Sequence, residues 1–320
     1  MIEPSDTLAM PNLSSRGLTA GPRSYLESLV LFSNYYQSYY LDKFTDLTFT
    51  VPLDSQTNAT ILCCALENKL TLPDGGVIID IPKSLLPKEE KQLLSRILQK
   101  LQDLAKTYHC EQIIIKDCLT NNGLSPLGKL LFNQKYKSRL TFEMIVDYPG
   151  FQPDDFYRNL RKSYKSLVNW GKRSLITTYL NQENPDFDQF KSFQDFHHKI
   201  SGRKTRSDES WNIQFEMIKA GIAELALATY QDNLVAGSLF TDYLNTSIYF
   251  TGVYERELFD YGLSHFLLYD GIYRSHLRGR TKQFSLGYFD TDISDSKWYN
   301  IQFFKKGFCD KLKPVIFWSV

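Results

Sequence analysis

Three strand-like runs in the second half of the chain narrow the choice of folds more than any other part of the sequence. Residues 223–230, 234–243 and 247–254 are rich in apolar and aromatic side chains, and short polar turns separate them. Turns this short join antiparallel neighbours. A helix is expected over residues 259–277 and a further strand over 283–287. This order predicts an α/β fold of the α+β type, with a mixed sheet.

A weaker version of the same order occurs in the first half of the chain. A helix there is followed by three strand-like runs, a helix that opens at Pro87 and two more strands. With 320 residues, of which 42% are hydrophobic and 23% charged, the chain is long and apolar enough for two globular cores. We therefore predict a loose tail at residues 1–23, a first domain at 24–181 and a second domain at 182–320.

The composition argues against several functional classes. A net charge of +1 is low for a protein that binds nucleic acid over a wide surface. The five cysteines lack the paired spacing of a zinc site, and the adjacent His197 and His198 would point about 100° apart on a helix, so we expect no metal. The sequence has neither a signal-peptide pattern nor a run of 18 apolar residues, which predicts a cytoplasmic protein without a membrane span.

Two basic segments are candidates for contact with an anionic ligand. The helix expected over residues 156–175 carries a run of cations that includes Arg161, and the polar loop at 201–208 carries Arg203 and Arg206. Arginine can bind phosphate or carboxylate through two parallel hydrogen bonds. The alternative is that both segments are only solvated surfaces, which is the usual role of charge runs. The residues alone leave both alternatives open.

The last forty residues hold the densest group of candidate functional side chains. A strand is expected to end at Gly287, and a polar loop and a second, lysine-bearing strand follow it. Strand ends and the loops after them are where α/β proteins place their chemistry. The candidates in this stretch are Tyr288, Asp290, Lys297 and Lys305.

Four features together resemble the FemAB-like branch of the GNAT acyltransferase superfamily. The resemblance covers residues 45–315 and implies two tandem GNAT-like domains. It also implies an N-acyltransferase of polysaccharide biosynthesis or the cell envelope, with acyl-CoA, above all acetyl-CoA, as donor and the amine of an amino-sugar, surface-glycan or cell-wall precursor as acceptor. The four features are the basic helix from Leu160, the Gly202–Arg206 loop before Trp211, the run Val235-Ala-Gly-Ser-Leu239, and the ending with Leu286-Gly287, Lys297 and Phe304-Lys305-Lys-Gly-Phe308.

The resemblance and the chemistry of acyl transfer assign roles to the candidates. Transfer to an amine needs a cation or a hydrogen-bond donor at the developing oxyanion and a group that removes a proton. The resemblance puts Lys305 at the position of a functional lysine. Glu255, just after the third strand-like run, is the best-placed general base, and Asp290 is the other candidate catalytic carboxylate. The expected substrate- or phosphate-binding residues are Arg203, Arg206, Lys297, Arg161, Tyr249 and Tyr288.

Two other functions stay open. One is an aminoacyl-tRNA-dependent, FemX-type transfer to a cell-wall precursor, and the other is a non-catalytic binding or scaffold role for the same fold. Ordinary GNAT proteins carry a glycine-rich run that holds a pyrophosphate at the start of the crossover helix, whereas residues 254–262 hold one glycine here. The expected partner is a small-molecule acceptor such as a nucleotide-linked amino sugar, with transfer RNA ranked second, and the sequence predicts no oligomeric state.

Overall fold

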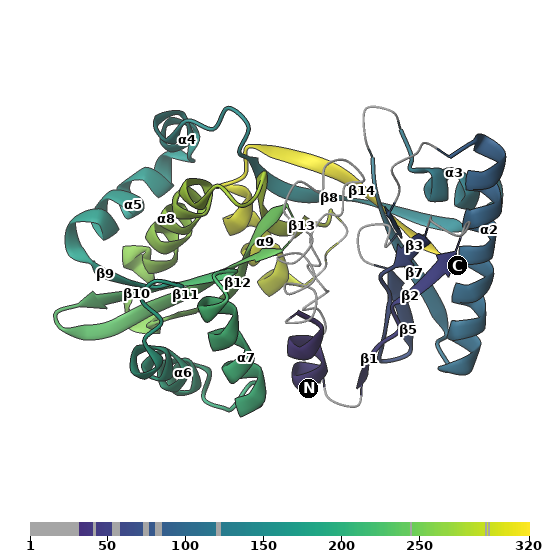
Figure 1. Ribbon diagram of the computed structural model, residues 1–320. Coiled ribbons are helices and arrows are strands. Elements are labelled where there is room, and N and C mark those ends of the chain that lie inside the picture. Colours follow the sequence, from purple (N-terminus) through teal and green to yellow (C-terminus); the bar gives the residue numbers. More distant parts are fainter. Residues whose placement is uncertain are drawn as a thin grey trace. The chain divides into compact units, whose positions relative to one another are not determined.

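Two compact units make up the described part of the chain in this computed structural model. The first unit contains the described residues between Tyr40 and Glu143 together with Lys313–Val320, and the second contains Met144–Leu312 with the described residues up to Tyr39. The predicted tail at 1–23 lies outside the described residues. The structure describes residues 32–40, 43–52, 58–72, 77–80, 85–119, 123–243, 245–291, 293 and 295–320 (Figure 1).

The division between the two units falls inside strand β8 (Lys137–Asp147), between Glu143 and Met144. The sequence predicts a domain boundary between residues 181 and 182 instead, and both of these residues lie within the second unit. Composition reveals boundaries that fall in polar, flexible linkers, and a division inside a regular strand has no such signal. The division into domains at 24–181 and 182–320 stays a prediction.

The first unit contains helix α2 (Pro87–Thr107), which begins where the sequence predicts. Pro87 takes the first helical position, where its missing N–H costs nothing, and two glutamates lie in the first turn. The apolar stripe of α2, which includes Ile97 and Leu101, is fully buried in the core of this unit. Five strands of this unit are adjacent in the order β1 (Phe44–Asp46), β4 (Cys64–Leu66), β5 (Lys69–Leu72), β7 (Gln112–Cys118) and β14 (Lys311–Ser319). A separate three-stranded sheet contains β2 (Phe49–Pro52), β3 (Asn58–Ile61) and β6 (Val77–Asp80). The unit also contains the short helix α3 (Pro126–Asn133).

The predicted meander is confirmed in the second unit. Strands β10 (Ala223–Tyr230), β11 (Asn233–Tyr243) and β12 (Thr246–Tyr254) pair antiparallel in succession. Strand β13 (Gln283–Phe289) then pairs parallel to β12, as a helical crossover allows. Strand β9 (Ile176–Leu180), which the sequence did not predict, pairs antiparallel to β10. The order in this unit is therefore β8-β13-β12-β11-β10-β9, a mixed sheet.

Helices cover both faces of this sheet (Figure 1). A Cβ on Gly271 would lie 2.1 Å from the Phe240 ring, and a Cβ on Gly237 would lie 2.5 Å from the Phe193 ring. Phe240 and Gly237 are three residues apart on β11 and so face opposite ways. Helices α5 and α8 therefore cover one face, and α6 and α7 the other. The helices of this unit are α4 (Pro153–Asn159), α5 (Lys162–Ser174), α6 (Phe187–Ser201), α7 (Asp208–Lys219), α8 (Leu263–Arg278) and α9 (Ser296–Lys306).

Two predicted helices are interrupted in the structure. The helix predicted at 156–175 is broken into α4 and α5, because Leu160 and Arg161 are extended, with ψ of 145° and 135°. The helix predicted from residue 259 begins at Leu263, since a 3₁₀ turn, η3 (Arg256–Tyr261), and Gly262 at φ +73° come before it. Glycine adopts this left-handed conformation without the strain that a side chain would cause.

The lysine-bearing segment was predicted as a strand, and this prediction is wrong. The segment forms helix α9, whose N-terminus is capped by Asp295. The Asp295 carboxylate accepts hydrogen bonds from the backbone N–H groups of Lys297 and Trp298, which satisfies groups that a helix start leaves without partners. An Asp cap before an aromatic run was the signal that distinguishes this helix from a strand.

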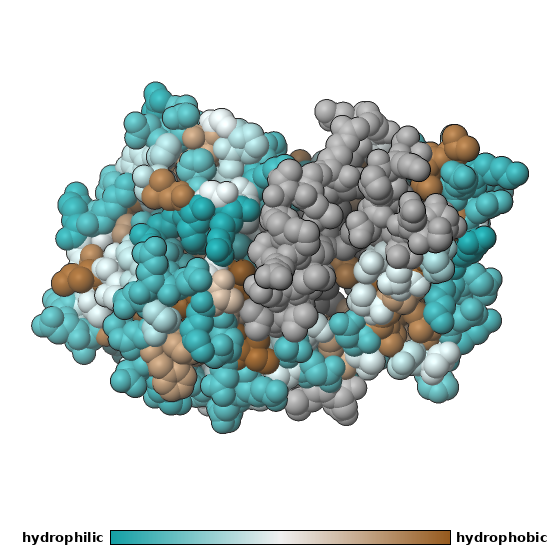
Figure 2. Space-filling view, viewed as in Figure 1, coloured by the Kyte–Doolittle hydropathy of each residue, from teal (hydrophilic) through white to brown (hydrophobic). Residues whose placement is uncertain are grey.

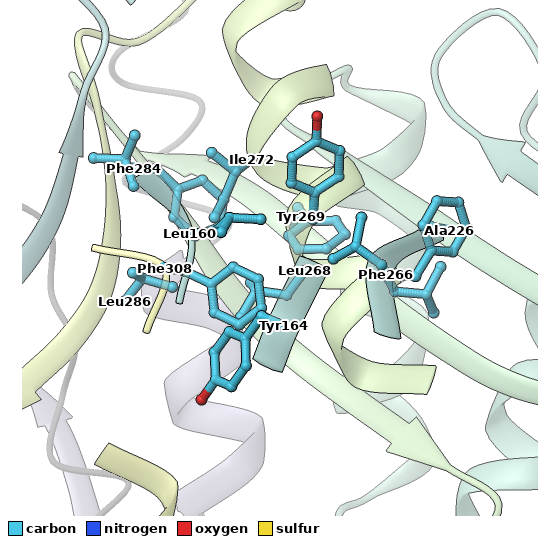
Figure 3. Close-up of a cluster of buried hydrophobic side chains, with 14 of the residues drawn as sticks. Leu160, Tyr164, Ala226, Phe266, Leu268, Tyr269, Ile272, Phe284, Leu286 and Phe308 are labelled. Atoms are coloured by element: carbon cyan, nitrogen blue, oxygen red, sulfur yellow. The ribbon is translucent and has the colours of Figure 1, made fainter. Parts of the chain in front are cut away.

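An apolar core lies between the sheet and the helices α5 and α8, where the side chains converge (Figure 3). The rings of Tyr164 from α5 and Phe308, which follows α9, have centroids 5.0 Å apart. Phe284 and Leu286 of β13 belong to the same cluster and are almost fully buried. The core therefore fixes the positions of α9 and β13, which carry most of the candidate residues.

No helix in the described part of the chain is long and apolar enough to cross a membrane. Figure 2 shows apolar side chains scattered in small groups among hydrophilic ones on the face in view. Scattered apolar side chains of this kind are ordinary for a protein surface.

Candidate functional site

The parallel strands β12 and β13 diverge shortly after they begin. Their pairing among the described residues joins Thr246 to Gln283 and ends with Ile248 opposite Ser285. The backbone N–H of Gly287 donates instead to the Ser285 side chain, at 3.2 Å. On the other side of β12, a bulge at Phe250 interrupts the register with β11. Bulges bend a strand and re-aim its side chains, so this part of β12 is shaped differently from a regular central strand.

Three hydroxyl groups form a chain beside this divergence. The Tyr254 hydroxyl lies 2.8 Å from the Ser238 Oγ and 2.7 Å from the Tyr249 hydroxyl. Gly252 makes room for the chain, because a Cβ at this position would lie 1.7 Å from the Tyr249 hydroxyl oxygen. These residues belong to the face of the sheet that α5 and α8 cover.

Burial keeps both phenols of this chain protonated. Desolvation raises the pKa of Tyr249 well above its ordinary value, and the neighbouring Tyr254 raises it further. Desolvation raises the pKa of Tyr254 as well, although its hydrogen bonds to Ser238 and Tyr249 oppose the shift. At neutral pH both phenols are therefore hydrogen-bond donors with fixed neighbours.

Lys305 of α9 approaches the same hydroxyl chain. Its ammonium nitrogen lies 5.6 Å from the centroid of the Tyr249 ring and 3.9 Å from the place where a Cβ on Gly287 would be. Gly287 has φ +88°, a conformation that side chains rarely adopt. The structure thus brings together Lys305 and Tyr249, two residues that the sequence predicts to be functional.

Arg161 and Tyr164 hold α9 in this position. The Tyr164 hydroxyl donates to the Phe304 carbonyl oxygen at 3.0 Å, and the Arg161 guanidinium lies 4.1 Å from the centroid of the Phe303 ring and donates to its carbonyl oxygen at 3.4 Å. A Cβ on Gly307 would lie 2.1 Å from the Tyr164 ring, so the helix end and the ring are in close contact. Arg161, predicted to bind substrate, therefore already has contacts that position α9.

The opposite face of β12 carries the second group of predicted residues. Arg206, in the loop between α6 and α7, donates from Nη1 to the Thr251 hydroxyl at 2.9 Å. Its guanidinium carbon lies 4.7 Å from the centroid of the Trp211 ring and 5.6 Å from that of Tyr39. Arg203, in the same loop, is exposed. The two arginines that the sequence predicts as a pair thus have different surroundings.

The other predicted residues lie at strand and helix ends. The Glu255 carboxylate caps η3 by accepting from the Arg256 backbone N–H, and it lies 3.9 Å from the Lys199 ammonium nitrogen. The backbone N–H of Asp290 donates to the Gln302 side chain at 3.0 Å. Lys297 is exposed in the first turn of α9, and Tyr288 follows Gly287 on β13.

Sequence reasoning missed three residues of the site. Ser238 and Tyr254 were not singled out, because a serine and a tyrosine in a strand carry no chemical signal until their partner is known. Gly252 was also missed, although a glycine within a predicted strand often marks a bulge or a close contact. Among the residues described, no three His, Cys, Asp or Glu side chains gather in a way that could hold a metal ion.

The chain is similar in fold to FemX and to two other solved structures, in agreement with the FemAB-like fold that the sequence predicts. FemX superposes with a TM-score of 0.62 at 15% identity, over 89% of this chain and 90% of FemX. The C-terminal domain of a lysylphosphatidylglycerol synthetase from Agrobacterium fabrum gives 0.58 at 12% identity, over 93% and 90% of the two chains. L-PGS from Bacillus licheniformis gives 0.54 at 13% identity, over 95% and 93%.

Sequence comparison adds nothing to this likeness. The sequence matches no family model and no curated protein. At identities this low the likeness establishes the fold alone, and function has to be argued from the site.

Proposed function

We propose that the second unit catalyses N-acyl transfer, in which an amine attacks the carbonyl carbon of an acyl thioester where β12 and β13 diverge. The observation that carries this proposal is the approach of the Lys305 ammonium group to the ring of Tyr249, whose hydroxyl belongs to the partly buried hydroxyl chain. In the reaction a C–N bond forms, the C–S bond breaks, and the amine loses a proton. A cation and a neutral phenol side by side suit the stabilisation of negative charge on oxygen or sulfur.

In this proposal Lys305 stabilises the oxyanion of the tetrahedral intermediate. Its position at the end of α9 is held by the contacts of Arg161 and Tyr164 with Phe303 and Phe304. A cation that is already in place before the reaction needs little reorganisation as charge develops. Removal of one such group typically lowers kcat by about 100- to 1,000-fold.

Tyr249 is the proposed hydrogen-bond donor to the reacting group. Three hydroxyls carry three protons, and the two hydrogen bonds between them use two. If Ser238 donates to Tyr254 and Tyr254 donates to Tyr249, the third proton points outward from Tyr249. Because burial raises the pKa of both phenols, neither becomes a phenolate at neutral pH, and all three hydroxyls keep their protons.

Glu255 and Asp290 remain the proposed catalytic carboxylates, with Glu255 as general base. They follow directly on β12 and β13, the two strands that diverge. Glu255 is half-buried, and its carboxylate oxygens are shared between the Arg256 N–H and Lys199. Tyr288 and Lys297 are the proposed contacts of substrate on the β13 side.

Acyl-CoA is the proposed donor, but the start of α8 does not fit its pyrophosphate in the usual way. A Cβ on Gly262 would lie 2.6 Å from the Leu167 Cβ, so close packing against α5 accounts for this glycine. No glycine-rich cradle exists at this place in the described chain. This observation favours a second candidate function, transfer from an aminoacyl-tRNA to a cell-wall precursor.

The acceptor that we propose is the amine of an amino sugar, such as a nucleotide-linked one, or of another surface-glycan precursor, with the enzyme acting in the cytoplasm. The resemblance stated above supports this choice. A non-catalytic binding role is the remaining alternative, since the same fold serves proteins with different functions.

The test compares Lys305→Ala with Lys306→Ala, a neighbouring lysine on an exposed part of α9. Each purified protein is assayed with acetyl-CoA and with aminoacyl-tRNA against a panel of amino sugars and nucleotide-linked amino sugars. We expect turnover by the wild type and by Lys306→Ala, and a loss of about 100-fold or more in Lys305→Ala with unchanged melting temperature. Equal activity of the two variants would sink the role of Lys305, and no turnover with either donor would favour the binding role.

A further inference from the structure

Arg206 is a half-buried cation for which the described structure provides no carboxylate. Its Nη1 donates to the neutral Thr251 hydroxyl, and its planar faces lie against Trp211 and Tyr39. The Nε atom is buried and has no hydrogen-bond partner among the described residues. Buried polar groups are nearly always paired, so an arginine Nε left without a partner calls for an explanation.

Other polar atoms without partners gather around the same tryptophan. The Trp211 Nε1, in a side chain 1% exposed, has no hydrogen-bond acceptor among the described residues. The rings of His197 and His198 lie 5.2 and 5.8 Å from the Trp211 ring, and Nδ1 of His197 and Nε2 of His198 are also without partners. One turn along α7, both amide atoms of the fully buried Gln214 have none either. Among these atoms the Arg206 Nε, the Trp211 Nε1 and the Gln214 Nε2 are hydrogen-bond donors, and donors without a partner among the described residues, beside a cation, are the surroundings that an anion requires.

We propose that Arg206 and the Trp211 N–H bind an anionic group of the acceptor, a carboxylate or a phosphate monoester. This inference rests on the proposed function, and it names the chemistry by which the acceptor is held. Because Nη1 is occupied by Thr251, the edge formed by Nε and Nη2 is the one that meets the anion, through two parallel hydrogen bonds. The Nε is covered in this structure, so the α6–α7 loop or the Tyr39 ring moves aside when the anion binds.

Arg206 and Tyr249 lie at neighbouring positions along β12. Thr251, which holds Arg206, is two residues beyond Tyr249 on the same strand, and this corresponds to about 7 Å. The two side chains belong to opposite faces of the sheet, but the pairing of β12 with β13 ends before either residue among those described. An acceptor with its anion at Arg206 and its amine beside Tyr249 therefore has to pass from one face of the sheet to the other, along the side of β12 that β13 leaves unpaired.

Isothermal titration without any acyl donor tests the proposal on the full chain. The probes are glucosamine 6-phosphate and L-alanine. Each is compared with a counterpart that has no anionic group: glucosamine lacks the phosphate, and alaninamide has an amide in place of the carboxylate. We compare the wild type with Arg206→Gln and with Lys204→Gln, which also removes one positive charge from the same loop, at an exposed position. We expect one anionic probe to bind the wild type and Lys204→Gln, and to bind Arg206→Gln about 10- to 100-fold more weakly. The probe that binds identifies the anion as phosphate or carboxylate.

Three outcomes would overturn the proposal: no probe binds, the neutral counterparts bind equally well, or Arg206→Gln and Lys204→Gln weaken binding equally. Trp211→Phe is a second variant that keeps an aromatic ring against Arg206 and removes the N–H together with the five-membered part of the indole, and we expect it to bind the anionic probe several-fold more weakly. If Arg206→Gln does not fold, Arg206→Lys takes its place. Lysine keeps the positive charge but cannot donate two parallel hydrogen bonds to the anion. Because no donor is present, failure of acyl transfer in the Lys305 assay would leave this result unaffected.

Discussion

Two arginines of the second unit, Arg278 and Arg206, are removed from water in different ways. Arg278, with its side chain 17% exposed, donates from Nε and Nη2 to the two oxygens of Asp242 at 3.1 and 2.7 Å, and its Nη1 lies 3.4 Å from Glu224. Arg206 has a single hydroxyl partner, and its Nε has none among the described residues. The fold itself neutralises Arg278, whereas it holds Arg206 in place without neutralising it. The comparison separates a cation that stabilises the fold from one that is available to a ligand.

The largest expected effect is the loss of stability in Arg278→Gln. The change leaves Asp242 and Glu224 with fewer cations in a site that is almost fully buried. Removing one partner of a buried ion pair typically costs about 3–5 kcal/mol. Arg206→Gln removes no ion pair and should cost less than about 1 kcal/mol. Urea unfolding followed by circular dichroism measures both, and equal losses in the two variants would contradict the comparison.

Arg206 and Arg278 also differ in their effect on His197, whose ring is beside Trp211. Burial, together with the nearby Arg206 charge and His198, lowers its pKa to about 4. Because the unfolded value of about 6.5 is higher, the unfolded chain binds the proton first as pH falls. The stability from this group is thus complete above pH 6.5 and is lost between about pH 6.5 and 4, by up to about 3 kcal/mol.

The measurement for His197 is an NMR titration of the wild type and Arg206→Gln. We expect the pKa of His197 to rise in Arg206→Gln, because a positive neighbour has been removed. Arg278→Gln should leave it unchanged. An identical His197 pKa in wild type and Arg206→Gln would mean that the two groups do not interact, and burial alone would then explain the shift.

The hydroxyl chain of Tyr249, Tyr254 and Ser238 is like Arg278 in one respect, because the fold supplies the hydrogen bonds between its members. Gly252→Ala should break it, because the new Cβ would lie 1.7 Å from the Tyr249 hydroxyl. Forcing extra atoms into a well-packed site typically costs about 1–3 kcal/mol. In a Tyr249→Phe background the same change should cost less, since the clashing oxygen is gone. A double-mutant cycle by thermal unfolding measures the difference, and equal costs in both backgrounds would show that another contact limits the space.

The sequence predicted the meander, the crossover helix and the fold, because turn residues and apolar periodicity act over short distances. It also predicted Lys305 and Tyr249 as candidates, and the structure brings these two together. It could not distinguish Arg206 from Arg203, because the difference lies in Trp211 and Thr251, whose positions depend on the packing of α7 and β12. The break at Leu160 was missed for a related reason: the residues on both sides favour a helix, and the break depends on tertiary packing.

The smallest expected effect, that of Ser238→Ala, tests the direction of the hydroxyl chain. Loss of one buried hydrogen bond costs about 1 kcal/mol, so the protein should remain folded. If Ser238 donates to Tyr254, its removal lets Tyr254 and Tyr249 exchange roles, and the outward proton of Tyr249 is no longer fixed. We then expect kcat to fall by about fivefold with an unchanged KM, since the hydrogen bond matters in the transition state and not in binding. If KM rises and kcat does not fall, the chain only shapes the substrate site, and it then belongs with Arg278 as a structural element.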